Sequence, residues 1–171
     1  MRVSESEFAS SCPEPSATDV PWLTDDEQAS WRAYLQASRA LEFVLDAELQ
    51  QAGMSLAEYE LLSMLSEAPD HVLRMSKLAD ITVQSRSRVT HSATRLERRG
   101  WVERRKAADD GRGIELFLTE QGWDAVQSAA RVHVAGVQEH LVQQMDPQLF
   151  GALGDAMGKV RDHLIGNHYN P

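Results

Sequence analysis

The chain has 171 residues, a formal net charge of -9 at neutral pH and 42% hydrophobic residues. This length allows one domain or two small ones, and the apolar fraction is sufficient for a buried core. The single cysteine, Cys12, excludes an internal disulfide framework and fits a reducing compartment. Because the sequence has no apolar run of about 18 residues and no apolar segment near its start, we expect a cytoplasmic protein without a membrane span or signal peptide.

Positive charge is concentrated in one part of this acidic chain. Residues 74–112 hold eleven of the seventeen Lys and Arg residues against five acids, so the block is net +6. Local positive charge suits a polyanionic partner, and the acidic remainder limits nonspecific binding. The charge pattern therefore favours DNA binding over catalysis.

The N-terminal part predicts a tail followed by a long helix. Residues 1–22 are rich in Ser and Pro and have no helical or alternating period, so we expect a flexible tail. Thr24 and Glu27 have the spacing of a capping box. Apolar residues then recur every three or four positions to about Gln51, and Gly53 ends the helix.

Shorter elements are predicted next. Ser55 and Glu58 form a second capping box and open a short helix. Its expected buried side is Leu56, Tyr59, Leu62 and Leu65. Residues 71–74 suit one short strand, and Ser76 is expected to cap a small helix around residues 77–80.

A basic helix is predicted from about Ser85 to Arg99, before Gly100. On a helical wheel its apolar side is narrow and comprises Val89, Ser92, Ala93 and Leu96. The opposite side is polar and basic and comprises Gln84, Ser87, His91, Thr94, Arg95 and Arg98. Such a helix packs through its small residues and presents long basic side chains outward.

The remaining residues predict a hairpin and two long helices. Residues 101–105 and 114–118 alternate as strands do, around a turn rich in Asp and Gly. Helical periodicity then runs from Thr119 to Met145, and Pro147 begins a last helix. The apolar stripes of the first and last two helices exceed the needs of a small basic domain, which predicts a helical oligomer interface.

Two motifs in this order resemble the MarR family of bacterial winged helix-turn-helix regulators. The first, at residues 78–104, reads LADITVQSRSRVTHSATRLERRGWVER, and the second, at residues 110–122, reads DGRGIELFLTEQG. The family's wing pattern falls on Asp110, Arg112, Leu118, Thr119 and Gly122. The resemblance covers roughly residues 24–165.

The resemblance implies a mainly α fold with a small β-hairpin wing, in a homodimeric transcriptional regulator without a cofactor. Residues 53–118 would form the winged helix-turn-helix region, and residues 23–52 and 119–165 the helical dimerisation region. In such proteins the recognition helix enters the major groove and the wing reaches the adjacent minor groove. A twofold dimer should bind pseudo-palindromic double-stranded DNA with half-sites ~34 to 36 Å apart.

By the same resemblance, base and phosphate contacts would come from the basic helix and the wing. The expected residues on the helix are Gln84, Ser85, Arg86, Ser87, Arg88, Thr90, His91, Thr94 and Arg95. Arg112 would enter the minor groove, oriented by Asp110, and Arg104 and Lys106 would contact phosphates. The alternative is a solvated helix face on which Ser85 serves only as the cap.

Aromatic residues leave two interpretations open. Trp31, Tyr34 and Tyr59 either belong to the dimer core or line an effector crevice, which the resemblance places between the helical region and the winged module. Such a crevice could hold a flat phenolic ligand. His133 and His140 are ~10.5 Å apart along a helix, too far to bind one metal ion together. Cys12 has no basic neighbour to activate its thiol, so a redox role stays undecided.

The leading functional hypothesis is a DNA-binding repressor released by a small aromatic ligand. The alternative is a winged-helix adaptor that binds proteins and not DNA. The nine basic residues from Arg86 to Arg112 favour the first, since an adaptor has no use for such a cluster. We expect no enzyme, because the sequence has no phosphate-binding glycine loop, metal-ligand cluster or nucleophile with a partnered base.

Overall fold

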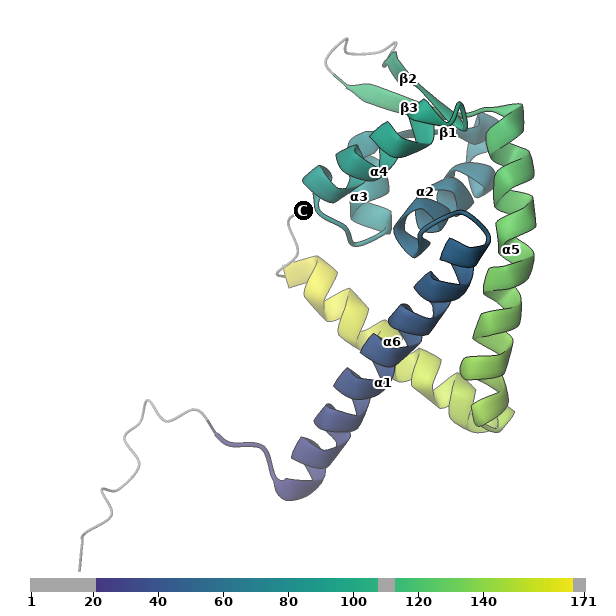
Figure 1. Ribbon diagram of the computed structural model, residues 1–171. Coiled ribbons are helices and arrows are strands. Elements are labelled where there is room, and N and C mark those ends of the chain that lie inside the picture. Colours follow the sequence, from purple (N-terminus) through teal and green to yellow (C-terminus); the bar gives the residue numbers. More distant parts are fainter. Residues whose placement is uncertain (1–20, 108–112, 168–171) are drawn as a thin grey trace, which may run out of the picture. The chain divides into compact units, whose positions relative to one another are not determined.

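The computed structural model describes residues 21–107 and 113–167 (Figure 1). The chain divides into two compact units, with the boundary between Gln36 and Ala37 inside the first helix. The described helices are α1 (Asp25–Gln51), α2 (Leu56–Glu67), α3 (Met75–Ile81), α4 (Arg86–Arg98), α5 (Glu120–His140) and α6 (Pro147–Asn167). Within these residues, no helix is both long and apolar enough to span a membrane.

Both predicted capping boxes are confirmed. At the start of α1, the Thr24 amide donates to Glu27 Oε2 at 2.8 Å, and the Glu27 amide donates to Thr24 Oγ1 at 3.3 Å. Ser55 and Glu58 make the same reciprocal pair before α2. These bonds satisfy amides that have no partner inside the helix and so fix where each helix begins.

The helix-turn-helix consists of α3, the turn at residues 82–85 and α4. Ser85 caps α4 as predicted, with its hydroxyl accepting from the Arg88 amide at 3.2 Å. The prediction that Ser76 caps α3 is wrong. The helix already begins at Met75, directly after a strand, so Ser76 lies inside it, and the N-cap residue Arg74 makes no side-chain capping bond.

The sheet has three antiparallel strands, β1 (Val72–Arg74), β2 (Val102–Lys106) and β3 (Ile114–Leu118), in the order β1-β3-β2. The predicted hairpin forms β2 and β3, and the short strand β1 adds to the free edge of β3. The Ala107 amide donates to the Gly113 carbonyl at 2.9 Å at the far end of the hairpin. Asp110 and Arg112, which we predicted at the wing tip, lie outside the described residues.

The core of the second unit lies among α2, α3, α4, α5 and the sheet (Figure 1). The inner face of α4 is the predicted one, with Val89, Ser92, Ala93 and Leu96 all buried. Leu61 joins Leu62 and Leu65 on the buried side of α2. The start of α5 packs so closely that a Cβ on Gly122 would lie 2.0 Å from the Trp101 carbonyl oxygen.

The last helices differ from the predicted pattern in one respect. The apolar period predicted to run to Met145 is interrupted, because α5 ends at His140 and a 3₁₀ turn follows at Val142–Gln144. Along α6, Leu149, Val160, Leu164 and Ile165 are exposed to solvent in the single chain.

Candidate nucleic-acid interface

The outer face of α4 presents a continuous polar and basic surface. Its first three turns carry no acid, and the first acid on the helix is Glu97. The side chains exposed here and at the preceding cap are Ser85, Arg86, Ser87, Arg88, Thr90, His91 and Arg95. The opposite face of α4 packs in the core, so the outer face is available to a partner.

Gln84 lies apart from this surface. It is 6% exposed, and its side-chain amide donates to Glu60 Oε2. Burial raises the pKa of Glu60, although the Gln84 hydrogen bond and the charge of Arg88 oppose the shift. The turn before α4 therefore directs Gln84 into the protein, and the exposed set begins at Ser85.

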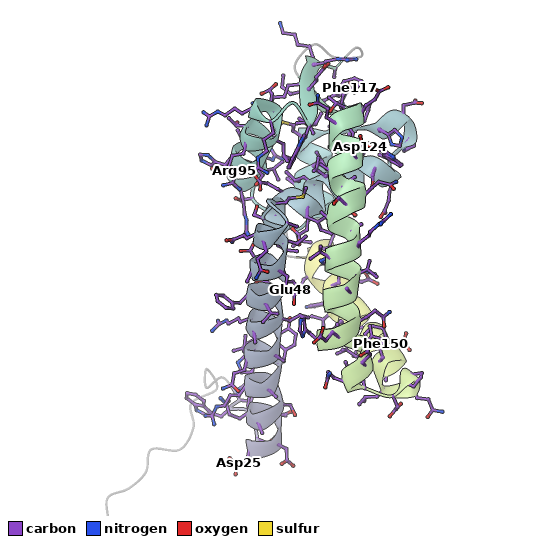
Figure 2. The ribbon with its side chains drawn as sticks, turned by 45° about the vertical axis from the view of Figure 1, so that its right-hand side comes forward. Asp25, Glu48, Arg95, Phe117, Asp124 and Phe150 are labelled. Carbon is purple, nitrogen blue, oxygen red and sulfur yellow. The ribbon has the colours of Figure 1, made fainter. Side chains whose placement is uncertain are left out.

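Arg95 is held by a buried carboxylate. Its Nε donates to Glu58 Oε1 at 2.9 Å, with side-chain exposures of 54% for Arg95 and 5% for Glu58. Burial alone would raise the pKa of Glu58, but hydrogen bonds from Ser55 and the Arg95 ion pair hold it below the usual value. Figure 2 labels Arg95 among the side chains that extend outward from the module. Its guanidinium is thus oriented by α2 while its outer edge faces solvent.

Arg104 points from β2 to α4. Its guanidinium donates to Glu97 Oε2 at 3.1 Å, to the Thr90 carbonyl at 3.0 Å and to Thr94 Oγ1 at 2.8 Å. Its side chain is only 25% exposed. Two residues that we predicted as separate DNA contacts, Thr94 and Arg104, are therefore bonded to each other. Lys106, farther along the strand, is exposed.

A hollow of about 480 Å³ lies between the beginning of α2 and the outer face of α4. Hydroxyl and cationic groups make up much of its wall, contributed by Ser55, Ser85, Ser87, Arg88, His91 and Arg95. These groups suit a phosphate oxygen or the acceptor edge of a base. The sequence identified Ser55 only as a cap, because nothing in its local pattern indicates that α2 begins beside α4.

A second cavity, of about 310 Å³, contains one of the three aromatic candidates. Tyr59 and His133 line it with their ring centroids 4.5 Å apart, together with Ser63, Met64 and Thr82. Burial lowers the pKa of His133. The sequence analysis considered His133 only with His140 and argued against a shared metal ion, and the position of His133 opposite Tyr59 comes from the packing of α5 on α2.

Trp31 and Tyr34 belong to the first unit. Their rings stack with centroids 5.8 Å apart, and each residue is 47% exposed.

His140 bonds to Glu48 at 2.7 Å, separately from His133. Among the described residues, no three His, Cys, Asp or Glu side chains are grouped to hold a metal ion. Cys12 lies outside those residues.

Comparisons with known proteins agree on one family. A model of the MarR family matches residues 52–113. Sco3205, a MarR family transcriptional regulator from Streptomyces coelicolor crystallised with DNA, is 38% identical with a TM-score of 0.82. The match covers 86% of this chain and 92% of that one. AbsC, a MarR family regulator from the same organism, is also 38% identical, with a TM-score of 0.81 and coverage of 86% and 100%.

A curated relative agrees. The transcriptional regulator PecS of Dickeya dadantii is 23% identical over 134 residues, which are 77% of this chain and 80% of PecS. The resemblance, the mainly helical fold and the three-stranded sheet beside an exposed basic helix all lead to one conclusion. This chain belongs to the MarR family of winged helix-turn-helix, DNA-binding transcriptional regulators, which are not enzymes.

Proposed function

We propose that the chain is a homodimeric repressor that binds a pseudo-palindromic operator through α4 and the wing and is released by a small aromatic ligand. The observation that carries the DNA-binding part is the exposed face of α4, which presents Arg86, Arg88 and His91 with hydroxyl groups and no acid. Such a face complements the acceptor-rich edges of the major groove.

The direct contacts that we propose on α4 are Ser85, Arg86, Ser87, Arg88, Thr90 and His91. An arginine can bond a guanine edge through two parallel donors, whereas serine and threonine hydroxyls reach phosphates or bases. On the wing we propose Lys106 for a phosphate and Arg112, oriented by Asp110, for the minor groove. Gln84 drops out because its side chain is buried against Glu60.

The homodimer is supported by α6, which exposes Leu149, Val160 and Leu164 in the single chain. A monomer rarely exposes such large apolar side chains in one stripe, so a second copy of the chain is the partner that fits best.

Repression is supported by relatives whose names state it. MprA of Escherichia coli is 35% identical over 74 residues, 43% of this chain and 42% of MprA.

Selection from a random DNA pool tests the recognition proposal. The wild-type protein should select a pseudo-palindrome with half-sites about one helical turn apart. Arg86→Ala should weaken binding to it and relax one base position by about 1 to 3 kcal/mol. Arg32→Ala removes the same charge from α1 and should bind like wild type. Equal binding by Arg86→Ala and wild type would remove α4 from the interface.

We place the ligand in the cavity beside Tyr59 and His133. Its aromatic pair and hydroxyl groups suit a small, flat phenol. Such a ligand lowers DNA affinity only if it binds the DNA-incompetent state more tightly. A phenolic panel should release DNA from wild type, and His133→Ala should blunt that release. Trp31→Ala tests the other aromatic group, and an unchanged response would assign Trp31 and Tyr34 to the dimer core.

A further inference from the structure

We propose that Arg104 is a positioning residue that fixes the wing to the recognition helix through Glu97 and Thr94, and that it is not a phosphate contact. The inference rests on the proposed contact of α4 with DNA. It concerns how the two reading elements, α4 and the β2–β3 hairpin, are held in one geometry.

The contacts of Arg104 converge on one side of α4. The two terminal nitrogens of its guanidinium reach Glu97 Oε2, the Thr90 carbonyl and Thr94 Oγ1, all within 3.1 Å. Its backbone amide also donates to Glu97 Oε1, at 3.4 Å. Side chain and main chain of one strand residue are thus bonded to three residues of the helix, Thr90, Thr94 and Glu97.

The bonds around Thr94 form a closed set. Its hydroxyl donates to the Thr90 carbonyl at 2.8 Å and accepts from Arg104, which also donates to that carbonyl. A planar guanidinium has five donors in a rigid fork and can satisfy three acceptors at once, which an ammonium on a flexible stem cannot do in the same geometry. Arginine is therefore the residue type that this junction requires.

The position of Arg104 along β2 determines which part of the hairpin is fixed to α4. Val102 at the start of the strand is buried in the core. Past Arg104, Arg105 pairs with Glu103 of its own strand and Lys106 is exposed. Arg104 is thus the β2 side chain that ties the middle of the hairpin to α4 and holds the direction of β2 relative to the helix. Helix and wing can engage adjacent grooves together only if that direction is held.

The sign of the Glu97 effect separates a positioning residue from a phosphate contact. Glu97 is an acid on the DNA-facing helix, with a side chain 41% exposed. If Arg104 bound a phosphate, neutralising Glu97 would free the arginine and remove repulsion, so DNA affinity would hold or rise. If Arg104 positions the wing, neutralising Glu97 loosens the junction, and DNA affinity falls.

The experiment measures operator affinity of the full-length chain over a range of salt for Glu97→Gln, Arg104→Met, Arg104→Lys and the Glu97→Gln/Arg104→Met double variant. Each single variant should weaken binding about tenfold, because each breaks hydrogen bonds to a charged group. Glu97→Gln and Arg104→Met should change the dependence on salt equally, since both loosen the same wing, whereas loss of a phosphate contact would flatten it in Arg104→Met alone. The double variant should be no weaker than Arg104→Met, because both changes break one junction.

Arg86→Ala is the matched control, since it removes an arginine proposed to touch DNA directly and should weaken binding to the operator. Tighter binding by Glu97→Gln, or a dependence on salt that is flatter for Arg104→Met than for Glu97→Gln, would overturn the positioning role. If Arg104→Met binds like wild type while Arg86→Ala binds more weakly, only the positioning role of Arg104 is overturned. If both variants bind like wild type, the proposed contact of α4 with DNA is overturned as well. If Arg104→Met fails to fold, Thr94→Val removes one acceptor with little change of shape and should still weaken binding severalfold.

Discussion

Several arginines of the basic block serve the fold as well as the charge of the surface. Arg95 is oriented by Glu58, and Arg104 is bonded to α4. Arg99 donates to the Gly53 carbonyl and lies 4.6 Å from the centroid of the Trp101 ring. The positive potential of the block is therefore shared by residues that contact DNA in our proposal and residues that hold α4 in place.

At the same scale, Val83 in the turn before α4 has an unusual backbone. Its φ is 53°, in the left-handed region that costs a β-branched residue about 1 to 3 kcal/mol. Its side chain is half exposed, so little packing would be lost on truncation. Val83→Gly should raise the free energy of unfolding by about 1 kcal/mol after the entropy of the added glycine is counted. Urea unfolding measures this, and a lower midpoint for Val83→Gly would contradict a left-handed turn.

His140 should make stability depend on pH. The imidazole is hydrogen-bonded to Glu48, a residue that Figure 2 labels on α1. This hydrogen bond raises the pKa of the imidazole. The folded state therefore binds the proton more tightly than the unfolded state. The stabilisation is fully present below the unfolded pKa of about 6.5 and is lost as pH rises through the raised folded value.

Unfolding of wild type and His140→Gln at several pH values tests this. The difference in free energy of unfolding should be largest below about pH 6.5 and shrink above it. His133 is present in both proteins, so its opposite contribution cancels. Glu48→Gln removes the negative charge that helps to raise the pKa of His140 and should give a similar profile. A difference that does not change with pH would show that the ion pair does not stabilise the fold.

At the scale of elements, the helices of the winged module are held together by a few close contacts. Glu58 closes the capping box of α2 and also bonds Arg95 of α4, so one buried carboxylate fixes both helices. Gly122 lets the start of α5 approach the backbone at Trp101. The Thr119 hydroxyl donates to the Gly100 carbonyl in the same region, at 2.7 Å.

Gly122→Ala should therefore destabilise the protein strongly. The added Cβ would meet a backbone oxygen that no side-chain rotation can move, so we expect a loss of about 2 to 3 kcal/mol or more. Gly151→Ala is the control, because nothing lies within 4 Å of its added Cβ within the described chain. That change should be neutral or stabilising, since alanine favours a helix by about 1 kcal/mol. Equal melting temperatures for the two variants would contradict the packing of α5.

Elements with local signals were predictable from sequence, and elements set by distant contacts were not. Capping boxes and apolar periods located α1, α2 and α4 closely. The three-stranded sheet required the pairing of Val72 with Phe117, which no local pattern indicates. Gln84 was predicted on the outer face because a wheel extends the helix backward, whereas the turn at Val83 directs its side chain inward.

For the whole molecule, the central feature is a helix whose apolar stripe is not covered by any of the described residues of the single chain. Val160 and Leu164 of α6 are about half exposed. We predict that Val160→Glu/Leu164→Glu separates the homodimer into folded monomers, because charges would be buried in the interface without partners. Asp155→Lys, on the opposite side of the helical wheel, should leave the dimer intact. Sedimentation measures both, and a dimeric double variant would place the interface elsewhere.

The salt dependence of operator binding tests the central claim most directly. An acidic chain of net charge -9 can hold DNA only through local basic surfaces such as α4 and the wing. Two winged modules making about 6 to 10 phosphate contacts should lose about 10³- to 10⁵-fold in affinity between about 50 and 200 mM salt. Titration of a selected operator across that range should show this loss in wild type and a smaller one in Lys106→Ala, which removes a proposed phosphate contact. A flat response in wild type would contradict DNA recognition by these basic elements.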